Sequence, residues 1–264
     1  MIRKLFTIGQ RLERIKKIIW EADGMIPINM AAQFACSEGV EGDYLEFGVF
    51  EGESFAEAIA SFKRMSLRYS LKRNDPSRAY FEKEIKAKVD VDSPATGVDQ
   101  PKYMKRRFFA FDSFEGFPVM SGGDAEHPFW KPGRFATSEK SFYENIRRRH
   151  PDEIENVVIT KGFFSDTLKP SLYEELSLKK ASVVMIDSDL YSSCVDVLDF
   201  ITPLVGGGTV LIFNDWNTFK ASPKHGERRA VKEWLAAHGN FYLDYFASRG
   251  CHERAFILQV DGDN

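Results

Sequence analysis

The chain has 264 residues, of which 43% are hydrophobic and 28% charged, and its net charge at pH 7 is −3. These values are ordinary for a soluble globular protein, and they exclude the basic field that nucleic-acid-binding proteins carry. No apolar run is long enough to span a membrane, and charges interrupt the first residues too often for a signal peptide. The three cysteines lack CxxC spacing, which favours free thiols in a reducing compartment. We therefore expect a cytoplasmic protein that binds neither nucleic acid nor membranes.

The N-terminal residues follow a helical pattern. Apolar side chains recur at alternating spacings of three and four over residues 2–20, which predicts an amphipathic helix with one apolar stripe. This stripe must pack against the edge of a core or against another subunit. We therefore expect residues 1–40 to form a helical cap or an oligomerisation segment, and the stripe is our reason for expecting a homo-oligomer. A second, short helix is predicted over residues 30–37.

From residue 43 onward, strand patterns alternate with helix patterns. Buried strands are predicted at residues 43–48, 107–112, 156–161, 181–187 and 208–213. Helices are predicted from Gly52 onward, over residues 139–149, and from about Glu227 to Gly239. Two final strands, at residues 241–246 and 255–260, are typical of an antiparallel pair at the end of a sheet. The alternation predicts an α/β fold with a doubly wound, mostly parallel sheet and helices on both faces.

Two segments interrupt this alternation. Residues 70–106 are charged and contain proline, and residues 117–138 are rich in glycine, proline and aromatic residues. Long insertions after strands are usually lids or specificity loops, which is what we expect of both. A solvated helical excursion is an equally good interpretation of residues 70–106. No internal repeat is apparent, and we expect residues 1–264 to form a single domain.

Polar side chains follow two of the predicted strands directly. Asp187 and Asp189 come after one apolar run, and Asn214 and Asp215 come after the next. In open α/β sheets the carboxyl ends of the strands are where ligands bind and chemistry takes place. Two neighbouring strands that both end in oxygen ligands indicate a divalent cation site. The alternative is that these aspartates only cap the helices that follow.

The turn after the first strand has the composition of a nucleoside-binding site. Glu46, Gly48 and Gly52 form an E-x-G-x-x-x-G pattern between a strand and a helix. The glycines permit a tight turn, and the helix N-terminus offers unpaired N–H groups. A carboxylate at this turn suits a ligand with a positively charged amino-acid tail, such as S-adenosylmethionine (SAM), and disfavours the pyrophosphate of a nicotinamide cofactor.

The next two strands extend this pattern. Asp112 ends the second strand, where an acid accepts hydrogen bonds from the two ribose hydroxyls in this topology. Gly162 and Phe163 follow the third strand, where the ring could pack against adenine or simply belong to the core. The residues that we expect to contact the cofactor are Glu46, Gly48, Gly52, Ser54, Asp112, Ser113, Gly162, Phe163 and Asp187.

Five segments in this order resemble the macrocin O-methyltransferase family (TylF/MycF/NovP type): LEFGVFEGES, FAFDSFEGFP, KGFFSDTL, MIDSDLYSS and FNDW. The resemblance runs from about Gly42 to Trp234. It implies a class I SAM-dependent enzyme that methylates sugar hydroxyls in natural-product biosynthesis. It also implies a Rossmann-like sheet with an antiparallel C-terminal strand.

The resemblance assigns roles to the polar residues after the strands. The metal-binding acids of the family match Asp187, Asn214 and Asp215, which would hold Mg²⁺, and the proposed general base matches Asp189. Asn214 stands where the family usually has an acid. An amide oxygen can ligate Mg²⁺, but it brings no negative charge.

Together these features predict a SAM-dependent O-methyltransferase that acts on a hydroxyl of a sugar or glycosylated natural product. Mg²⁺ would lower the pKa of the acceptor hydroxyl and orient it, and Asp189 would take its proton. Two alternatives are an O-methyltransferase acting on a phenol or catechol, and a non-catalytic nucleoside-binding homologue.

Other side chains near the predicted site each have a functional and a structural interpretation. They are the alternative bases His127 and His225, the stacking candidates Trp130 and Phe135, and the possible anion contacts Arg228 and Arg229. Surface or loop-anchoring roles are the more common explanation for residues of these types.

Overall fold

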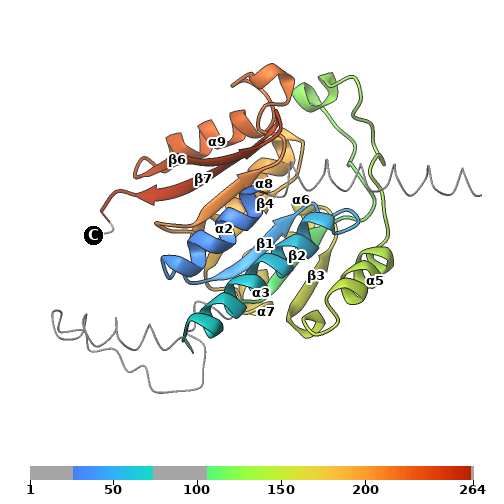
Figure 1. Cartoon of the computed structure of the whole chain (residues 1–264). Helices are drawn as coiled ribbons and strands as arrows, with labels where there is room; N and C mark the ends of the chain where they lie inside the picture. Colours follow the sequence, from blue (N-terminus) through green and yellow to red (C-terminus); the bar gives the residue numbers. More distant parts are fainter. Residues whose placement is uncertain (1–25, 74–105, 263–264) are drawn as a thin grey trace, which may run out of the picture.

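The computed structural model describes residues 26–73 and 106–262 (Figure 1). The helix predicted at residues 2–20 and nearly all of the 70–106 insertion lie outside the described residues. Among the described residues, no helix combines the length and the apolar character that crossing a membrane would require.

One seven-stranded sheet forms the centre of the fold, with the strand order β3-β2-β1-β4-β5-β7-β6. The strands are β1 (Asp43–Phe47), β2 (Phe108–Asp112), β3 (Val157–Lys161), β4 (Ala181–Ile186), β5 (Val210–Phe213), β6 (Phe241–Arg249) and β7 (Glu253–Val260). Strands β1 to β5 pair in parallel, and β7 pairs antiparallel with both β5 and β6. This confirms the predicted Rossmann-like, mostly parallel sheet with an antiparallel strand near its C-terminal edge.

Helices cover both faces of the sheet. One face packs against α2 (Ile26–Ser37), α3 (Glu53–Arg73) and α5 (Glu139–Arg149). The other face packs against α7 (Ser171–Glu175), α8 (Tyr191–Ile201) and α9 (Gly226–Ala237). A short helix, α6 (Phe164–Thr167), follows β3. The helices predicted at residues 30–37, after Gly52, at 139–149 and near Glu227 are all present.

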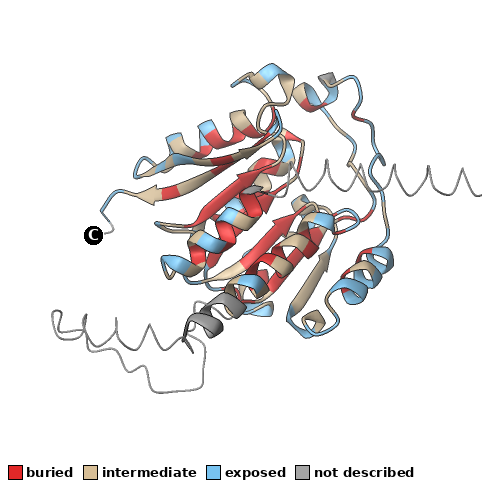
Figure 2. Cartoon of the chain, in the orientation of Figure 1, coloured by how far each residue is buried: buried red, intermediate tan, exposed pale blue. Residues whose placement is uncertain are grey.

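The strands supply side chains to two separate cores. Tyr44 on β1 points into the core beneath α3, and its neighbour Leu45 points into the core beneath α8. Burial on both faces explains why β4 and β5 are nearly continuous apolar runs in the sequence. Figure 2 shows this distribution, with buried residues along the central strands and exposed residues on the outer faces of the helices.

The carboxyl ends of β1 and β4 approach each other closely at Gly48. Its φ of +86° is a conformation that side-chain-bearing residues rarely adopt, and a Cβ there would lie 2.0 Å from the carbonyl oxygen of Asp187. The backbone N–H of Asp187 donates to the carbonyl oxygen of Phe47 at 2.8 Å. Glycine at position 48 is thus needed for the two strand ends to meet, and this junction is where the site is built.

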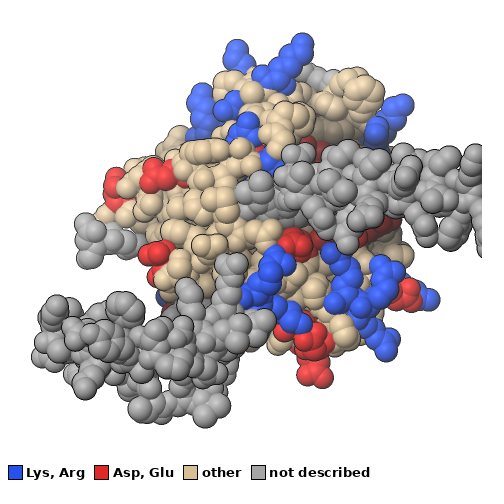
Figure 3. Space-filling view, viewed as in Figure 1, with Lys and Arg blue, Asp and Glu red and all other residues tan. Residues whose placement is uncertain are grey.

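The visible surface mixes charges of both signs. In Figure 3 basic side chains lie next to acidic ones around α3 and α5, where Lys63 pairs with Asp152 and Arg149 with Glu53. Arginines in the last turn of α5 also place positive charge at the negative, C-terminal end of the helix dipole, which is a favourable interaction. These residues form a solvated, mixed-charge face.

Candidate active site

A cavity of about 640 Å³ opens at the carboxyl ends of the parallel strands. It is lined by the turns after β1, β4 and β5 and by the segments that follow β2 and β3, including both ends of the 117–138 loop. Its volume is typical of sites that bind small molecules and cofactors. Of the predicted site residues, those in the wall are Gly48, Asp112, Ser113, Gly162, Phe163, Asp187, Asp189, Asn214 and Asp215.

Asp112 joins two turns at the edge of the cavity. Its Oδ2 accepts hydrogen bonds from the backbone N–H groups of Val49 at 2.8 Å and Phe50 at 3.0 Å. Its Oδ1 accepts from the N–H of Phe114 at 2.7 Å. The carboxylate therefore fixes the β1–α3 turn against the end of β2, and it also faces the cavity.

Glu46 lies behind the cavity wall and is fully buried. The hydroxyl of Tyr44 donates to its Oε2 and the hydroxyl of Ser54 donates to its Oε1, both at 2.5 Å. Burial is the main cause that raises the pKa of Glu46 from 4.5 to about 7, and the two hydroxyl donors oppose this rise. Among the described residues, neither Glu46 nor Ser54 belongs to the cavity wall.

Gly52 is also behind the wall, and its role is in helix packing. A Cβ at this position would lie 2.8 Å from the ring of Phe142 on α5. Gly162, by contrast, lines the cavity at the end of β3, where its N–H donates to the carbonyl oxygen of Asp112 at 2.9 Å. The E-x-G-x-x-x-G pattern therefore contains one glycine for the strand junction and one for the contact between α3 and α5.

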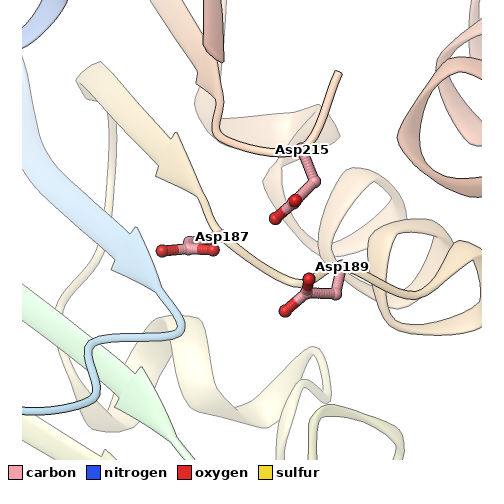
Figure 4. A group of neighbouring side chains, drawn as sticks. All are labelled: Asp187, Asp189 and Asp215. Atoms are coloured by element: carbon pink, nitrogen blue, oxygen red, sulfur yellow. The ribbon is translucent and has the colours of Figure 1, made fainter. Parts of the chain in front are cut away.

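Three carboxylates converge at the centre of the cavity. Asp187 directly follows β4, Asp189 lies in the turn into α8, and Asp215 lies two residues after β5. Each places an oxygen within 4.8 Å of the others. Figure 4 shows the three side chains directed into one space. Carboxylate oxygens are the hard donors that Mg²⁺ prefers, and it usually binds one or two of them together with water.

The proximity of these carboxylates changes their acidity. Burial, followed by the charge of Asp215, raises the pKa of Asp187 well above its usual range. The same two causes raise the pKa of Asp189, and Asp187 adds to the effect. A cation at the centre would remove the repulsion, so the cluster is chemically suited to hold one.

Asn214 differs from the three aspartates in its contacts. Its amide nitrogen donates a hydrogen bond to Oδ1 of Asp187 at 3.0 Å. Asn214 thus orients Asp187, while the cluster of neighbouring carboxylates consists of Asp187, Asp189 and Asp215. An acid at position 214 would repel Asp187 at this distance unless a cation lay between them.

Asp189 does not cap the helix that follows it. The N-cap residue of α8 is Leu190, whose side chain makes no capping bond. The cap comes from Asp124 in the 117–138 loop, which accepts from the N–H groups of Tyr191 at 2.7 Å and Ser192 at 3.1 Å. Asp189 itself has a φ of +56° and faces the cavity.

Aromatic contacts fix the rest of the 117–138 loop. Trp130 is buried, stacks on His127 and meets the ring of Phe219 edge to face, while Phe219 stacks on His225. None of these four is in the cavity wall formed by the described residues, and they tie the loop to the segment after β5. The functional interpretations of His127, His225 and Trp130 therefore have less support than their structural roles.

Phe50 and Phe135 form part of the cavity rim. Both have positive φ angles, of 45° and 62°, both are about half exposed, and their rings meet edge to face at 6.3 Å. Bulky residues rarely adopt this conformation, and such strain is concentrated at ligand-binding sites. The sequence analysis names Phe135 as a stacking candidate. No pattern in the sequence marks Phe50 as a residue of the site.

The structure places two further charged residues at the site, Arg134 in the cavity wall and Glu227 behind it. Arg134 is the one basic side chain in the cavity wall formed by the described residues, whereas Arg228 and Arg229 are not in it. Arg228 donates to the carbonyl oxygen of Ala221, and Arg229 pairs with Glu233. Glu227, at the start of the predicted helix, is buried behind Asp215, and no pattern in the sequence marks it as part of the site.

Comparisons with known proteins agree with this architecture. The chain is similar to the O-methyltransferase NovP (20% identity over 87% of this chain and 77% of that one, TM-score 0.56). It is also similar to the calicheamicin methyltransferase CalS11 (21% identity over 90% and 78%, TM-score 0.60). At these identities the structures show a shared fold. No curated protein sequence matches the chain.

The family follows from a sequence match. Residues 95–240, more than half of the chain, match the sequence model of the macrocin O-methyltransferase (TylF) family. The matched residues include β2 to β5 and thus all three converging aspartates. The chain belongs to the macrocin O-methyltransferase (TylF) family and is a SAM-dependent O-methyltransferase.

Proposed function

We propose that this enzyme transfers the methyl group of SAM to a hydroxyl group of a sugar or of a glycosylated natural product, with assistance from Mg²⁺. The observation that carries the proposal is the convergence of Asp187, Asp189 and Asp215 in a cavity whose other half has the nucleoside-binding turn. The structural relative CalS11 is described as a TDP-rhamnose 3′-O-methyltransferase, which supports a sugar as the acceptor. We also propose that the whole chain is one class I methyltransferase domain.

The cofactor is assigned to the side of the cavity formed by β1, β2 and β3. There Asp112 and Ser113 would contact the ribose, Gly48 and Gly162 would form the floor, and Phe163 would pack against the adenine. Glu46 and Ser54 act from behind the wall, where they support the turn through their mutual hydrogen bond. The excess of carboxylates over basic groups in the wall favours a ligand that carries positive charge, as SAM does.

The cation is assigned to Asp187 and Asp215, with Asn214 beside them. Both carboxylates face the same space, and their mutual repulsion fits a site that is completed by a divalent cation. When bound, Mg²⁺ would supply Lewis-acid activation of the acceptor hydroxyl. Asn214 holds Asp187 in orientation through its amide nitrogen.

Asp189 is assigned as the general base. It lines the cavity without capping α8, so its carboxylate is available to the acceptor. Burial and the neighbouring carboxylates raise its pKa, which makes it a stronger base than an exposed aspartate. As the acceptor oxygen forms a bond to the methyl carbon, the carbon–sulfur bond breaks, the hydroxyl proton passes to Asp189, and S-adenosylhomocysteine (SAH) is left.

A phenolic acceptor is the second candidate. The aromatic side chains of Phe50, Phe117 and Phe135 in the cavity wall favour it, because they could stack on a flat ring. A screen of hydroxylated acceptors that includes both glycosides and phenols distinguishes the two classes.

The central test is a calorimetric titration of SAH with and without Mg²⁺, in the wild type and in Asp187→Asn. We expect one SAH site per chain in both proteins and one Mg²⁺ site in the wild type alone, since the variant loses a charged ligand. Glu175→Gln, an exposed acid on α7, is the matched control and should behave like the wild type. Absence of SAH binding would remove the assigned cofactor site, and equal Mg²⁺ binding by Asp187→Asn would remove the assigned metal site.

A further inference from the structure

Glu227 is a buried acid directly behind the carboxylate cluster. It lies in the first turn of α9 and is 1% exposed, and it does not belong to the cavity wall formed by the described residues. Its Oε2 accepts a hydrogen bond from the backbone N–H of Asp215 at 3.0 Å. Glu227 is therefore connected to the site through the backbone of one of its three aspartates.

This hydrogen bond holds Asp215 at the point where the chain leaves the sheet. The N–H of Asn214, one residue earlier, is still paired with β4, to the carbonyl oxygen of Ile186 at 2.9 Å. Asp215 is next, and its N–H turns to Glu227. On the other side of Asp215, Thr218 donates its N–H to the carbonyl oxygen and its hydroxyl to Oδ1. Glu227 thus supplies the link between this turn and α9.

Burying the carboxylate of Glu227 lowers the stability of the fold, which argues against a purely structural role. Within the described part of the chain its Oε1 has no hydrogen-bond partner, although the atom is buried. A buried carboxylate with an unpaired oxygen near other carboxylates destabilises a fold, so its presence here indicates a role in the site.

We propose that Glu227 is a positioning residue for the metal centre, because it fixes the Asp215 backbone where the Asp215 carboxylate meets Asp187 and Asp189. The inference rests on the metal site in the proposed function. Residues that orient metal ligands without touching the metal typically contribute about tenfold or more to metal affinity. The contribution of Glu227 comes from the acceptor oxygen that it offers to the Asp215 N–H.

The test compares Glu227→Met, which keeps much of the side-chain volume but has no acceptor, with Glu227→Gln, which keeps an acceptor oxygen. Mg²⁺ is titrated calorimetrically into each protein without SAM, and SAH is titrated separately. We expect Glu227→Met to weaken Mg²⁺ binding by about tenfold or more, Glu227→Gln to stay within about threefold of the wild type, and SAH binding to be unchanged in both. Glu233→Gln, on the exposed side of the same helix, is the matched control.

The outcomes separate this inference from the proposed function. Wild-type Mg²⁺ affinity in Glu227→Met would overturn the inference and leave the metal site in place. Equal losses in Glu227→Met and Glu227→Gln would also overturn it, because the charge and not the hydrogen bond would then matter. If the wild type bound no Mg²⁺, the metal assignment itself would fail. Should Glu227→Met not fold, Glu227→Ala takes its place under the same criteria.

Discussion

At the scale of single residues, the site uses carboxylates for two different purposes. Asp187 and Asp189 present oxygens to the cavity, whereas Asp112 uses both oxygens to hold backbone N–H groups while it faces the cavity. The carboxylate of Asp112 fixes this turn and is also the group that we propose to bind the ribose, so both effects of its replacement must be measured.

We expect Asp112→Ala to weaken SAH binding by about tenfold or more, because the ribose loses its acceptor and the turn at Val49 and Phe50 loses its anchor. The protein should also be destabilised by about 1–3 kcal/mol, since the N–H groups of the buried residues Val49 and Phe114 lose their acceptor. Calorimetry and urea unfolding measure the two effects. Asp166→Ala, an exposed acid beside the third strand, is the control. Unchanged SAH affinity in Asp112→Ala would contradict the ribose assignment.

At the scale of elements, specific contacts hold the 117–138 loop in place beside the cavity. Asp124 attaches it to the start of α8, and the rings of Trp130 and Phe219 attach it to the segment after β5. The attachment at α8 begins two residues after Asp189, which has a left-handed backbone. The loop that would contact the acceptor is therefore connected to the turn that carries the proposed base.

Replacement of Asp124 tests this connection. We expect Asp124→Ala to lower the free energy of unfolding by about 1–2 kcal/mol, the usual cost of a lost helix cap, and to lower turnover more than SAH affinity. Asp124→Asn keeps an acceptor that caps helices about as well, so it should restore most of the stability. Urea unfolding and SAH titration give the two readouts. A stability loss as large in Asp124→Asn as in Asp124→Ala would argue against the capping role.

At the scale of the whole molecule, the sequence predicted the fold well because its signals are local. Strand and helix periods, the glycine turn at Gly48 and the acids at strand ends depend on neighbouring residues, and they predicted the sheet and the polar residues of the cavity wall at the ends of the strands. The contacts of Asp124 with α8 and of Glu227 with Asp215 join segments whose pairing no local pattern encodes.

The buried acids in and near the cavity should make the stability of the whole protein depend on pH. Burial raises the pKa of Glu46 from 4.5 to about 7, and it also raises the pKa values of Asp187, Asp189, Glu227 and Glu253. An acid with a raised pKa in the folded state binds more protons there than in the unfolded chain. Its contribution to stability is therefore most favourable at low pH and is lost as the pH rises toward the folded-state value.

We therefore expect the free energy of unfolding, without Mg²⁺ or SAM, to fall between about pH 5 and about pH 7, with Glu46 alone accounting for up to about 3 kcal/mol. Glu46→Gln removes that titration and should flatten the curve, whereas Glu175→Gln, an exposed acid, should not. Mg²⁺ should recover stability at the upper end of this range in the wild type and not in Asp187→Asn, because a ligand that binds only the folded state stabilises it. Urea unfolding across this range measures all three effects, and a stability that rises with pH would contradict the electrostatic account of the site.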